Sequence, residues 1–324
     1  MAKPLLDLLI KPREQEHPAL LDTTTVIAHV EEHVKPWLSL IRDLVSYGTN
    51  LIIRSVVSSA RTTKDRVVLT ILLRQAVAML DSIEVLLSRG CLHTANLQLR
   101  ALFESSTYIE WILASDAERK ARHYHVHNLR RKRIWASRAI SGSPEAAAFS
   151  TAMGKYGLSI TEDIKKKSRR QIRAINKILA HPDLAAINVE FDAIKAKRKQ
   201  EHDVAWYYPL GQKSFGSIAR ATGNSALYVM VYSGASEVMH SSSDDQHIKV
   251  EDGKLSLKQI RSLEGFDPIF RFTVCITLNL YQKILSEYRP DELSRFSHKY
   301  VEQWRNQFLQ SIKINYEISE VISI

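Results

Sequence analysis

Residues 68–114 read VLTILLRQAVAMLDSIEVLLSRGCLHTANLQLRALFESSTYIEWILA, and this stretch decides the fold class. Apolar side chains recur every three or four residues on both sides of Gly90, which is the spacing of a buried helix face. A capping box at residues 62–65 predicts where the first helix begins, and Gly90 fits the position just beyond its end. The stretch therefore predicts two long helices, the second from about Leu92 to Ala114, joined as an antiparallel hairpin that begins a bundle.

The rest of the chain shows similar helical spacing and few turn signals. Only 11 Gly and 9 Pro occur in 324 residues, which argues against a β-sandwich or barrel. Residues 247–257 carry an Asp252-Gly253 turn between two short alternating runs, which is a hairpin signal. We therefore predict an all-α fold, a multi-helix bundle with at most one small β-hairpin near residues 247–257. Short polar side chains and proline favour the first turn of a helix, so helix starts are expected at Asp22, Asp116, Asn224, Asp267-Pro268 and Pro290.

The chain is expected to consist of an arm and one domain with an insert. Residues 1–21 place charged residues between prolines and are expected to form a loosely held N-terminal arm. Residues 22–324 are expected to form a single α-helical domain, because 45% apolar residues suffice for a large core. The clearest break, Ser141-Gly142-Ser143-Pro144, begins a basic helical insert at about residues 144–202.

Charge and cysteine content narrow the classes of function. The net charge of +10 suits an anionic partner. Cys91 and Cys275 lie far apart and outside any Cys/His spacing, so neither a disulfide framework nor a zinc site is expected. No nucleotide, metal or catalytic-triad signature is present, so no cofactor is predicted. Charged residues interrupt the longest apolar runs and the N-terminus lacks a signal-peptide stretch, so we expect a cytoplasmic protein without a membrane span.

Two basic helical segments are candidates for nucleic-acid binding. The first, residues 119–133, is also rich in histidine, and its cationic side chains disfavour a metal site. The second lies in residues 161–179. Together with Lys195, Lys197, Arg198 and Lys199 of the next predicted helix, it is the strongest electrostatic feature of the chain. Each segment could contact phosphates or could be a solvated helix face, and the sequence leaves both alternatives open. The nucleic-acid-binding candidates are Arg122, Arg130, Arg131, Lys165, Lys166, Arg169, Arg170 and Arg173.

The catalytic candidates lie in two helices. Arg100 and Glu104 are four residues apart in an apolar helix, so they are expected to form an internal ion pair or to line a polar pocket together. Ser236 and His240 share a face where another helix ends. His240 is there either a general acid or base, or a cap on the negative end of the helix. We predict that Arg100, Glu104 and His240 converge with Ser236 on one semi-buried pocket.

The segment Arg100-Ala-Leu-Phe-Glu104 and the later spacing of Tyr232, Ser236 and His240 resemble a pattern of the domain of unknown function 5677 family of bacterial proteins. The resemblance covers about residues 60–245 and implies an all-α fold. A weaker resemblance is to HEPN-like helical RNases, in which four to six residues separate an arginine from a histidine. Residues 233–235, Ser-Gly-Ala, do not supply that arginine before His240, and Arg100 is the candidate to replace it in space.

These resemblances lead to two functional hypotheses. In the first, the protein is a bacterial stress or phage-defence effector that acts on RNA. His240 is then the acid or base, Arg100, Glu104 and Ser236 surround it, and the basic helices hold RNA or another polyanion. In the second, the protein is a non-catalytic helical interaction module, such as a homodimer, and the Arg/Glu/His cluster is structural. The first hypothesis requires His240 and Arg100 to approach one cleft beside the basic helices.

Overall fold

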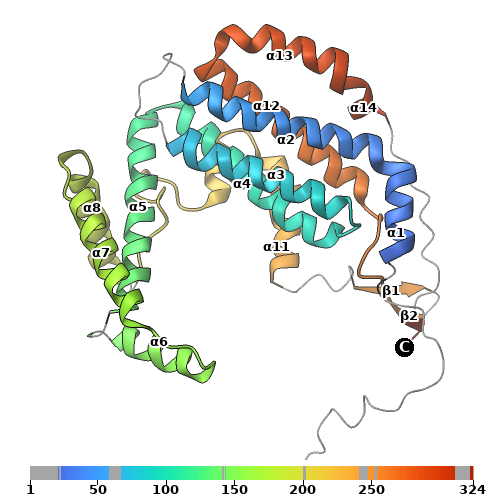
Figure 1. Ribbon diagram of the computed structural model, residues 1–324. Coiled ribbons are helices and arrows are strands. Elements are labelled where there is room, and N and C mark those ends of the chain that lie inside the picture. The colour runs from blue at the N-terminus through green and yellow to red at the C-terminus, as the bar shows by residue number, and fades with distance from the viewer. Residues whose placement is uncertain are drawn as a thin grey trace, which may run out of the picture.

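The computed structural model describes residues 21, 23–57, 67–140, 142, 144–199, 202–240, 247–251, 254–310 and 322–323. These residues form a helical bundle with one small sheet, which confirms the predicted all-α fold class (Figure 1). Residues 1–20 of the predicted arm, the helix start at Asp22 and the capping box at residues 62–65 lie outside the described residues. Within the described part, no helix combines the length and the apolar character that a bilayer span requires.

Four long helices build the centre of the bundle: α2 (Lys35–Val56), α3 (Arg74–Leu87), α4 (Leu92–Ala114) and α12 (Phe266–Tyr288) (Figure 1). α4 packs against both α3 and α12, so the predicted hairpin of α3 and α4 is confirmed. Gly90 links the two helices with a φ of +68°. A Cβ atom at this position would also collide with the side chain of Val26, so both the conformation and the space require glycine.

Shorter elements complete the bundle. α1 (Thr23–His29) leads through a π-helical turn (Val30–Val34) into α2, and α13 (Leu293–Lys299) and α14 (Arg305–Leu309) follow α12. Further π-helical turns occur at Val68–Leu73 and Tyr300–Trp304, and a 3-10 turn begins at Pro290. α4 is covered along one side by α9 (Phe215–Ala221), η5 (Tyr228–Ser233) and α11 (Gly234–Met239), with the single turn α10 (Ser225–Leu227) between the first two.

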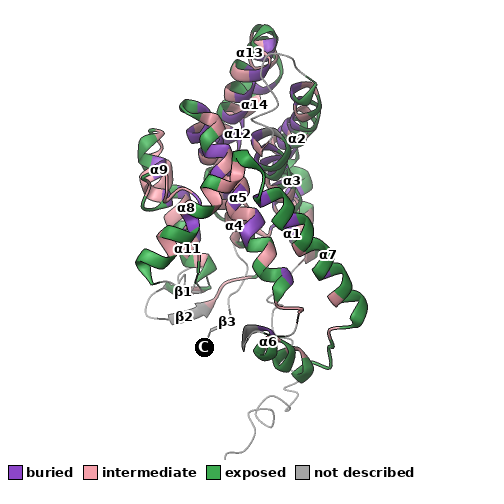
Figure 2. Cartoon of the chain, turned by 90° about the vertical axis from the view of Figure 1, so that its left-hand side faces the viewer, coloured by how far each residue is buried: buried purple, intermediate pink, exposed green. Residues whose placement is uncertain are grey.

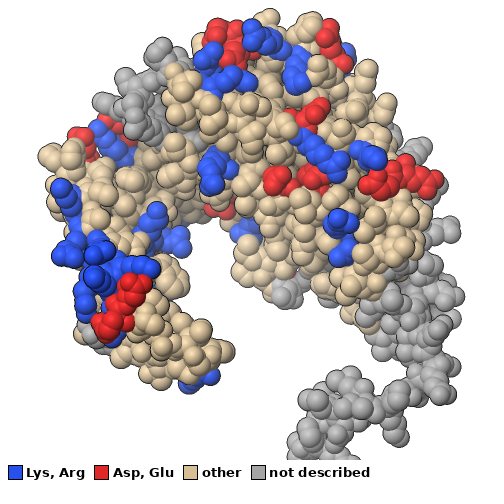
Figure 3. Space-filling view, in the orientation of Figure 1, with Lys and Arg blue, Asp and Glu red and all other residues tan. Residues whose placement is uncertain are grey.

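α5 (Ala117–Ser137) and the helices of the predicted basic insert, residues 144–202, extend together from the bundle; residues 117–204 are called the helical arm, or the arm. α5 leaves the end of α4 and packs against α7 (Glu162–Leu179) and α8 (Pro182–Arg198), while α6 (Pro144–Lys155) lies at the far end (Figure 1). The arm and the bundle border a broad hollow in the space-filling view (Figure 3). The arm has its own apolar cluster, separate from the main core, formed by Val126, Leu129, Ile175, Leu179, Phe191 and Val204.

The small sheet contains the two strands of the predicted hairpin, whose turn residues Asp252 and Gly253 lie outside the described residues. β1 (Ile248–Glu251) pairs antiparallel with β2 (Lys254–Leu257), with Ile248 opposite Leu257. A third strand, β3 (Ile322–Ser323), pairs with β2 near the C-terminus. β3 could not be predicted, because two residues are too few to carry a periodic pattern.

Helices begin next to Asp116, Asp267 and Asn224, as predicted, but none of these side chains caps its helix. Asp116 precedes α5 but has a left-handed φ of 49° and makes no side-chain cap. α12 begins at Phe266 rather than at the proline, and Asp267 forms an ion pair 2.8 Å from Arg271 one turn later. Asn224 precedes α10 without capping it, because its side chain bonds to Glu110 at 2.6 Å. In the last two cases a side-chain partner engages the polar group that was expected to cap the helix.

Candidate functional site

Arg100 lies at the contact of α4 with η5 and α11. Its guanidinium carbon is 4.0 Å from the centre of the Tyr232 ring, and its Nη1 is 3.5 Å from the Met239 sulfur. A guanidinium over an aromatic face is attracted by the ring quadrupole. Arg100 thus connects α4 to Tyr232 of η5 and to Met239 at the end of α11.

Glu104 does not pair with Arg100, so the predicted internal ion pair is wrong. Both side chains are described, and no ion pair joins them: Arg100 contacts Tyr232 and Met239, whereas Glu104 contacts Tyr108. The Tyr108 hydroxyl instead donates to Glu104 at 2.9 Å. Burial raises the pKa of the Tyr108 phenol, and the nearby Glu104 charge raises it further. Tyr108 therefore stays protonated and can donate its hydrogen to Glu104. Tyr108, and not Arg100, is the side-chain partner of Glu104.

Ser236 and His240 have different surroundings. The Ser236 hydroxyl is half-buried and donates to the Tyr232 carbonyl at 2.9 Å, a bond within its own helical segment. His240 follows the last residue of α11, and its side chain is exposed. Arg100 and Glu104 lie in the helix interface, whereas His240 lies at its solvent edge. The expectation that all of them share one semi-buried pocket is therefore wrong for His240. α11 ends at Met239, so His240 lies beyond the helix that packs on α4 and its side chain is exposed.

A cavity of about 400 Å³ lies next to this cluster, between α4, α11 and the segment that precedes α12. His93 and Asn96 line it from α4, Glu237 lines it from α11, and Lys258 lines it from the connection. The His93 ring stands edge-on to His247, with ring centres 4.8 Å apart. This volume is in the range of small-molecule sites. His93 and Asn96 lie seven and four residues before Arg100, so they are on the same face of α4. Extending that face toward the start of the helix would have identified both residues from the sequence.

Glu110 is a further titratable group that the sequence analysis missed. It lies one turn before the end of α4 and lines an open groove with Lys283 of α12. Burial raises its carboxyl pKa, although the bond from Asn224 and the Lys283 charge act in the opposite direction. A carboxyl group half-buried in an apolar helix has no sequence signature apart from its apolar neighbours.

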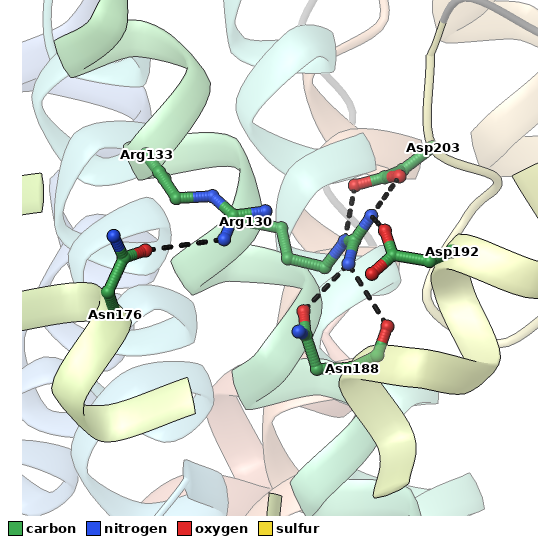
Figure 4. A network of polar contacts seen from close by, with 6 residues as sticks. All are labelled: Arg130, Arg133, Asn176, Asn188, Asp192 and Asp203. Carbon is green, nitrogen blue, oxygen red and sulfur yellow. Dashed lines mark hydrogen bonds and ion pairs between the residues drawn. The ribbon is translucent and has the colours of Figure 1, made fainter. Parts of the chain in front are cut away.

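Arg130 is buried, so its predicted role in nucleic-acid binding is wrong (Figure 4). Its guanidinium donates to Asp203 at 2.8 Å, to Asp192 at 2.7 Å and to the Asn188 side chain at 2.7 Å. Burial alone would raise the pKa of Asp203, but the hydrogen bonds and charge of Arg130 outweigh it and lower that pKa. Arg130 therefore fastens α5 to α8 and to the segment after α8.

The first half of α5 is also engaged within the protein. The Arg122 guanidinium contacts Glu118 on the same helix and lies 3.8 Å from Asp183 of α8. His123 is buried, with Nε2 3.0 Å from Glu190 and Nδ1 2.8 Å from the Arg119 carbonyl. Burial and the cationic side chain of Arg131 lower the pKa of His127 to about 4. Much of this segment therefore holds α8, and neither Arg122 nor Arg130 presents a free cation.

The second basic segment, α7, has a buried face and a basic face. The buried face of α7 lies inside the arm and carries Ser168, Ile175 and Leu179. Lys165 is paired with Glu162 at 2.6 Å and is half-buried. Figures 2 and 3 show the outer side of the arm as exposed and rich in Lys and Arg. The exposed cations of α7 that form no ion pair with any described residue are Lys166, Arg169, Arg170, Arg173 and Lys177, which we call the α7 stripe.

The sequence model of a family of unknown function, DUF5677, matches residues 66–255, which is more than half of the chain. The chain belongs to this family. The resemblance inferred from the Arg100–Glu104 and Tyr232–His240 segments is thereby confirmed. No curated protein and no solved structure gives a significant match.

The DUF5677 segment includes α4, the arm, α11 and β1, and it ends within β2. It therefore contains Arg100, His240 and the α7 stripe. It does not include α2 or α12, although both pack against the α3–α4 hairpin and supply buried core residues. The family segment of this chain therefore relies on flanking helices to cover its central hairpin.

Proposed function

We propose that this protein binds RNA through the phosphate backbone, with the α7 stripe as the contact surface. The observation that carries the proposal is the grouping of five exposed cations on the side of α7 opposite its buried residues. At 1.5 Å per residue, Lys166 and Lys177 are about 16 Å apart along the helix, a distance that spans several phosphates of one strand. Lysine and arginine contacts of this kind hold the backbone without reading bases. We infer that the partner is RNA or another polyanion and that the protein acts in the cytoplasm.

Neutralising part of the α7 stripe tests the proposal. We expect the Lys166→Gln/Arg170→Gln/Arg173→Gln variant to bind a single-stranded RNA oligonucleotide roughly 100-fold more weakly at 0.1 M salt. The slope of log affinity against log salt should become shallower by about 2, because each lost phosphate contact contributes about 0.7. Fluorescence anisotropy over a salt series measures both quantities.

The matched control removes the same charge elsewhere. Lys35, Arg295 and Arg305 are exposed cations of the bundle, so their combined replacement by glutamine keeps the net charge of the test variant. We expect this control to bind RNA nearly as well as the wild type. Equal loss in both variants would mean that net charge, and not the α7 stripe, governs binding.

A second candidate function, RNA cleavage, is supported by the position of Arg100. Its contact with Met239 brings an arginine of α4 to the residue directly before His240. In this proposal His240 accepts the proton of an RNA 2′-hydroxyl as its oxygen attacks the adjacent phosphorus, and the bond from phosphorus to the 5′-oxygen breaks as that oxygen takes a proton from solvent. Arg100 stabilises the charge that develops on the phosphate, and Glu104 and Ser236 orient Tyr108 and the η5–α11 segment. Such an activity would give a stress or phage-defence effector of the kind expected for HEPN-like proteins.

Incubation of the purified protein with total RNA tests the cleavage proposal. We expect wild-type protein to degrade RNA and His240→Ala to lose this activity while binding RNA with unchanged affinity. His202→Ala is the control, because His202 is an exposed histidine of the arm. Intact RNA after incubation with wild-type protein would exclude cleavage under those conditions and favour the alternative, a non-catalytic interaction module. Light scattering would then show whether that module is a homodimer.

A further inference from the structure

The cavity between α4, α11 and the segment that precedes α12 is lined largely by apolar side chains. Its volume of about 400 Å³ is large enough for a small organic molecule. Two exposed apolar side chains, Met230 and Ile260, and the half-buried ring of Phe272 line it. The side chains of the lining that are buried in the core are those of Leu92, Leu99, Val231, Ala235 and Ile269. This surface therefore suits a ligand with an apolar or aromatic face.

The elements that surround the cavity are fixed to one another. Ser262, in the segment between β2 and α12, donates its backbone N–H to the Gly90 carbonyl at 3.0 Å. The same residue forms a parallel bridge with Cys91, directly before α4. α11 also packs against α4. The cavity is therefore preformed, so that a ligand would spend little of its binding energy on ordering the protein.

Asn96 brings an unpaired amide to this surface. Its side chain is half-buried and forms no hydrogen bond with any residue that the structure describes. Partial burial of an amide without a partner is unfavourable, because the group gives up hydrogen bonds to water. An amide carries a donor and an acceptor side by side. Asn96 is therefore placed to receive a ligand that offers the complementary pair.

The charged side chains of the lining do not call for an anion. The Lys258 ammonium lies 3.6 Å from the Glu264 carboxylate, and both residues line the cavity. Glu237 adds a second carboxylate, and Gln259 adds a second amide. Among the described residues of the lining, negative charge thus balances or exceeds positive charge. The lining therefore favours an uncharged ligand over a phosphate chain or a fatty acid.

We propose that this cavity binds a nucleobase, with Asn96 on the polar edge of the base and Phe272 as an aromatic wall. A nucleobase is uncharged, has a flat face that can stack, and carries a donor next to an acceptor on its edge. Asparagine pairs with adenine through this arrangement, and aromatic side chains stack on bases of every kind. The base could belong to a free nucleoside or to an RNA chain. The inference does not rest on the α7 stripe.

Calorimetric titration of the full-length chain with adenosine tests the proposal. We expect adenosine to bind and to raise the melting temperature of the wild type. Asn96→Leu should weaken adenosine binding about tenfold, the loss expected for a pair of hydrogen bonds to a base. Its own melting temperature should not fall, because leucine removes an unpaired amide. The control is Asn279→Leu, at an exposed amide of α12, which should bind adenosine like the wild type.

Two further ligands decide the chemical class. Octanoate has an apolar chain and an anionic head, and benzylamine is an aromatic cation. Both should bind more weakly than adenosine. If either binds more tightly, or if adenosine does not bind the wild type, a nucleobase site is overturned. If adenosine binds Asn96→Leu as tightly as the wild type, it lies elsewhere and the assignment of this cavity is overturned.

The Lys166→Gln/Arg170→Gln/Arg173→Gln variant separates this inference from the proposed function. It should bind adenosine like the wild type, because the α7 stripe lies on the arm and the cavity lies in the bundle. Loss of adenosine binding in this variant would overturn the inference. If the wild type binds adenosine but no RNA, the proposed function fails and the inference stands. Displacement of adenosine by oligoadenylate would assign the base to an RNA chain, and its retention would assign it to a free nucleoside.

Discussion

Replacing Arg130 by methionine is expected to lower the free energy of unfolding by about 3–5 kcal/mol. Methionine fills much of the same volume but cannot donate the five hydrogen bonds that Arg130 makes to Asp203, Asp192 and Asn188. The Asp203 side chain is as buried as that of Arg130, so its carboxylate would be left buried without this counter-charge. The cost comes mainly from that uncompensated buried charge rather than from a large net stabilisation by the ion pair itself.

Urea unfolding followed by circular dichroism measures the loss, and the next residue supplies the control. Arg131 is exposed, so Arg131→Met should change the free energy of unfolding by no more than about 0.5 kcal/mol. RNA binding by folded Arg130→Met should stay close to that of the wild type, because Arg130 is buried. If both variants unfolded at the same urea concentration, the network around Arg130 would not stabilise the arm.

Replacing Gly48 by alanine is expected to lower the free energy of unfolding by at least about 3 kcal/mol, the upper part of the range for overpacked cores. Gly48 is buried in α2, where an added Cβ would collide with the Tyr281 hydroxyl and lie 2.8 Å from a Val77 methyl. Tyr281 is itself fully buried and donates to the Leu44 carbonyl at 2.8 Å. The phenol of α12 therefore reaches the α2 backbone only because residue 48 has no side chain.

Two further variants make this prediction specific. Gly234 is helical and exposed with no atom near a built Cβ, so Gly234→Ala should leave stability unchanged or slightly raised. Tyr281→Phe removes the hydroxyl that meets the new methyl group, so it should cost less in the Gly48→Ala background than in the wild type. Additive losses in the double variant, measured by thermal melts, would show that Tyr281 is not the source of the collision.

The helices could be predicted because their signals are local. The bounds of α4 follow from apolar spacing within the helix and from Gly90, and the hairpin of β1 and β2 follows from a turn signal between alternating runs. The spacing of Arg100 and Glu104 correctly placed them on one face of α4. Their partners could not be predicted, because Tyr232 reaches Arg100 from a segment more than a hundred residues away.

By itself, the sequence determined the helical class of this protein, its main helices, the region of the DUF5677 resemblance and a strong surplus of positive charge. Only the tertiary structure decided which charges face solvent. Arg130 and Arg131 are neighbours of the same residue type, yet the first is buried against Asp203 and the second is exposed. A helix turns by about 100° at each residue, so adjacent side chains point in different directions. Which direction is buried depends on where α8 and the following segment pack, and that is set by contacts between residues distant in the chain.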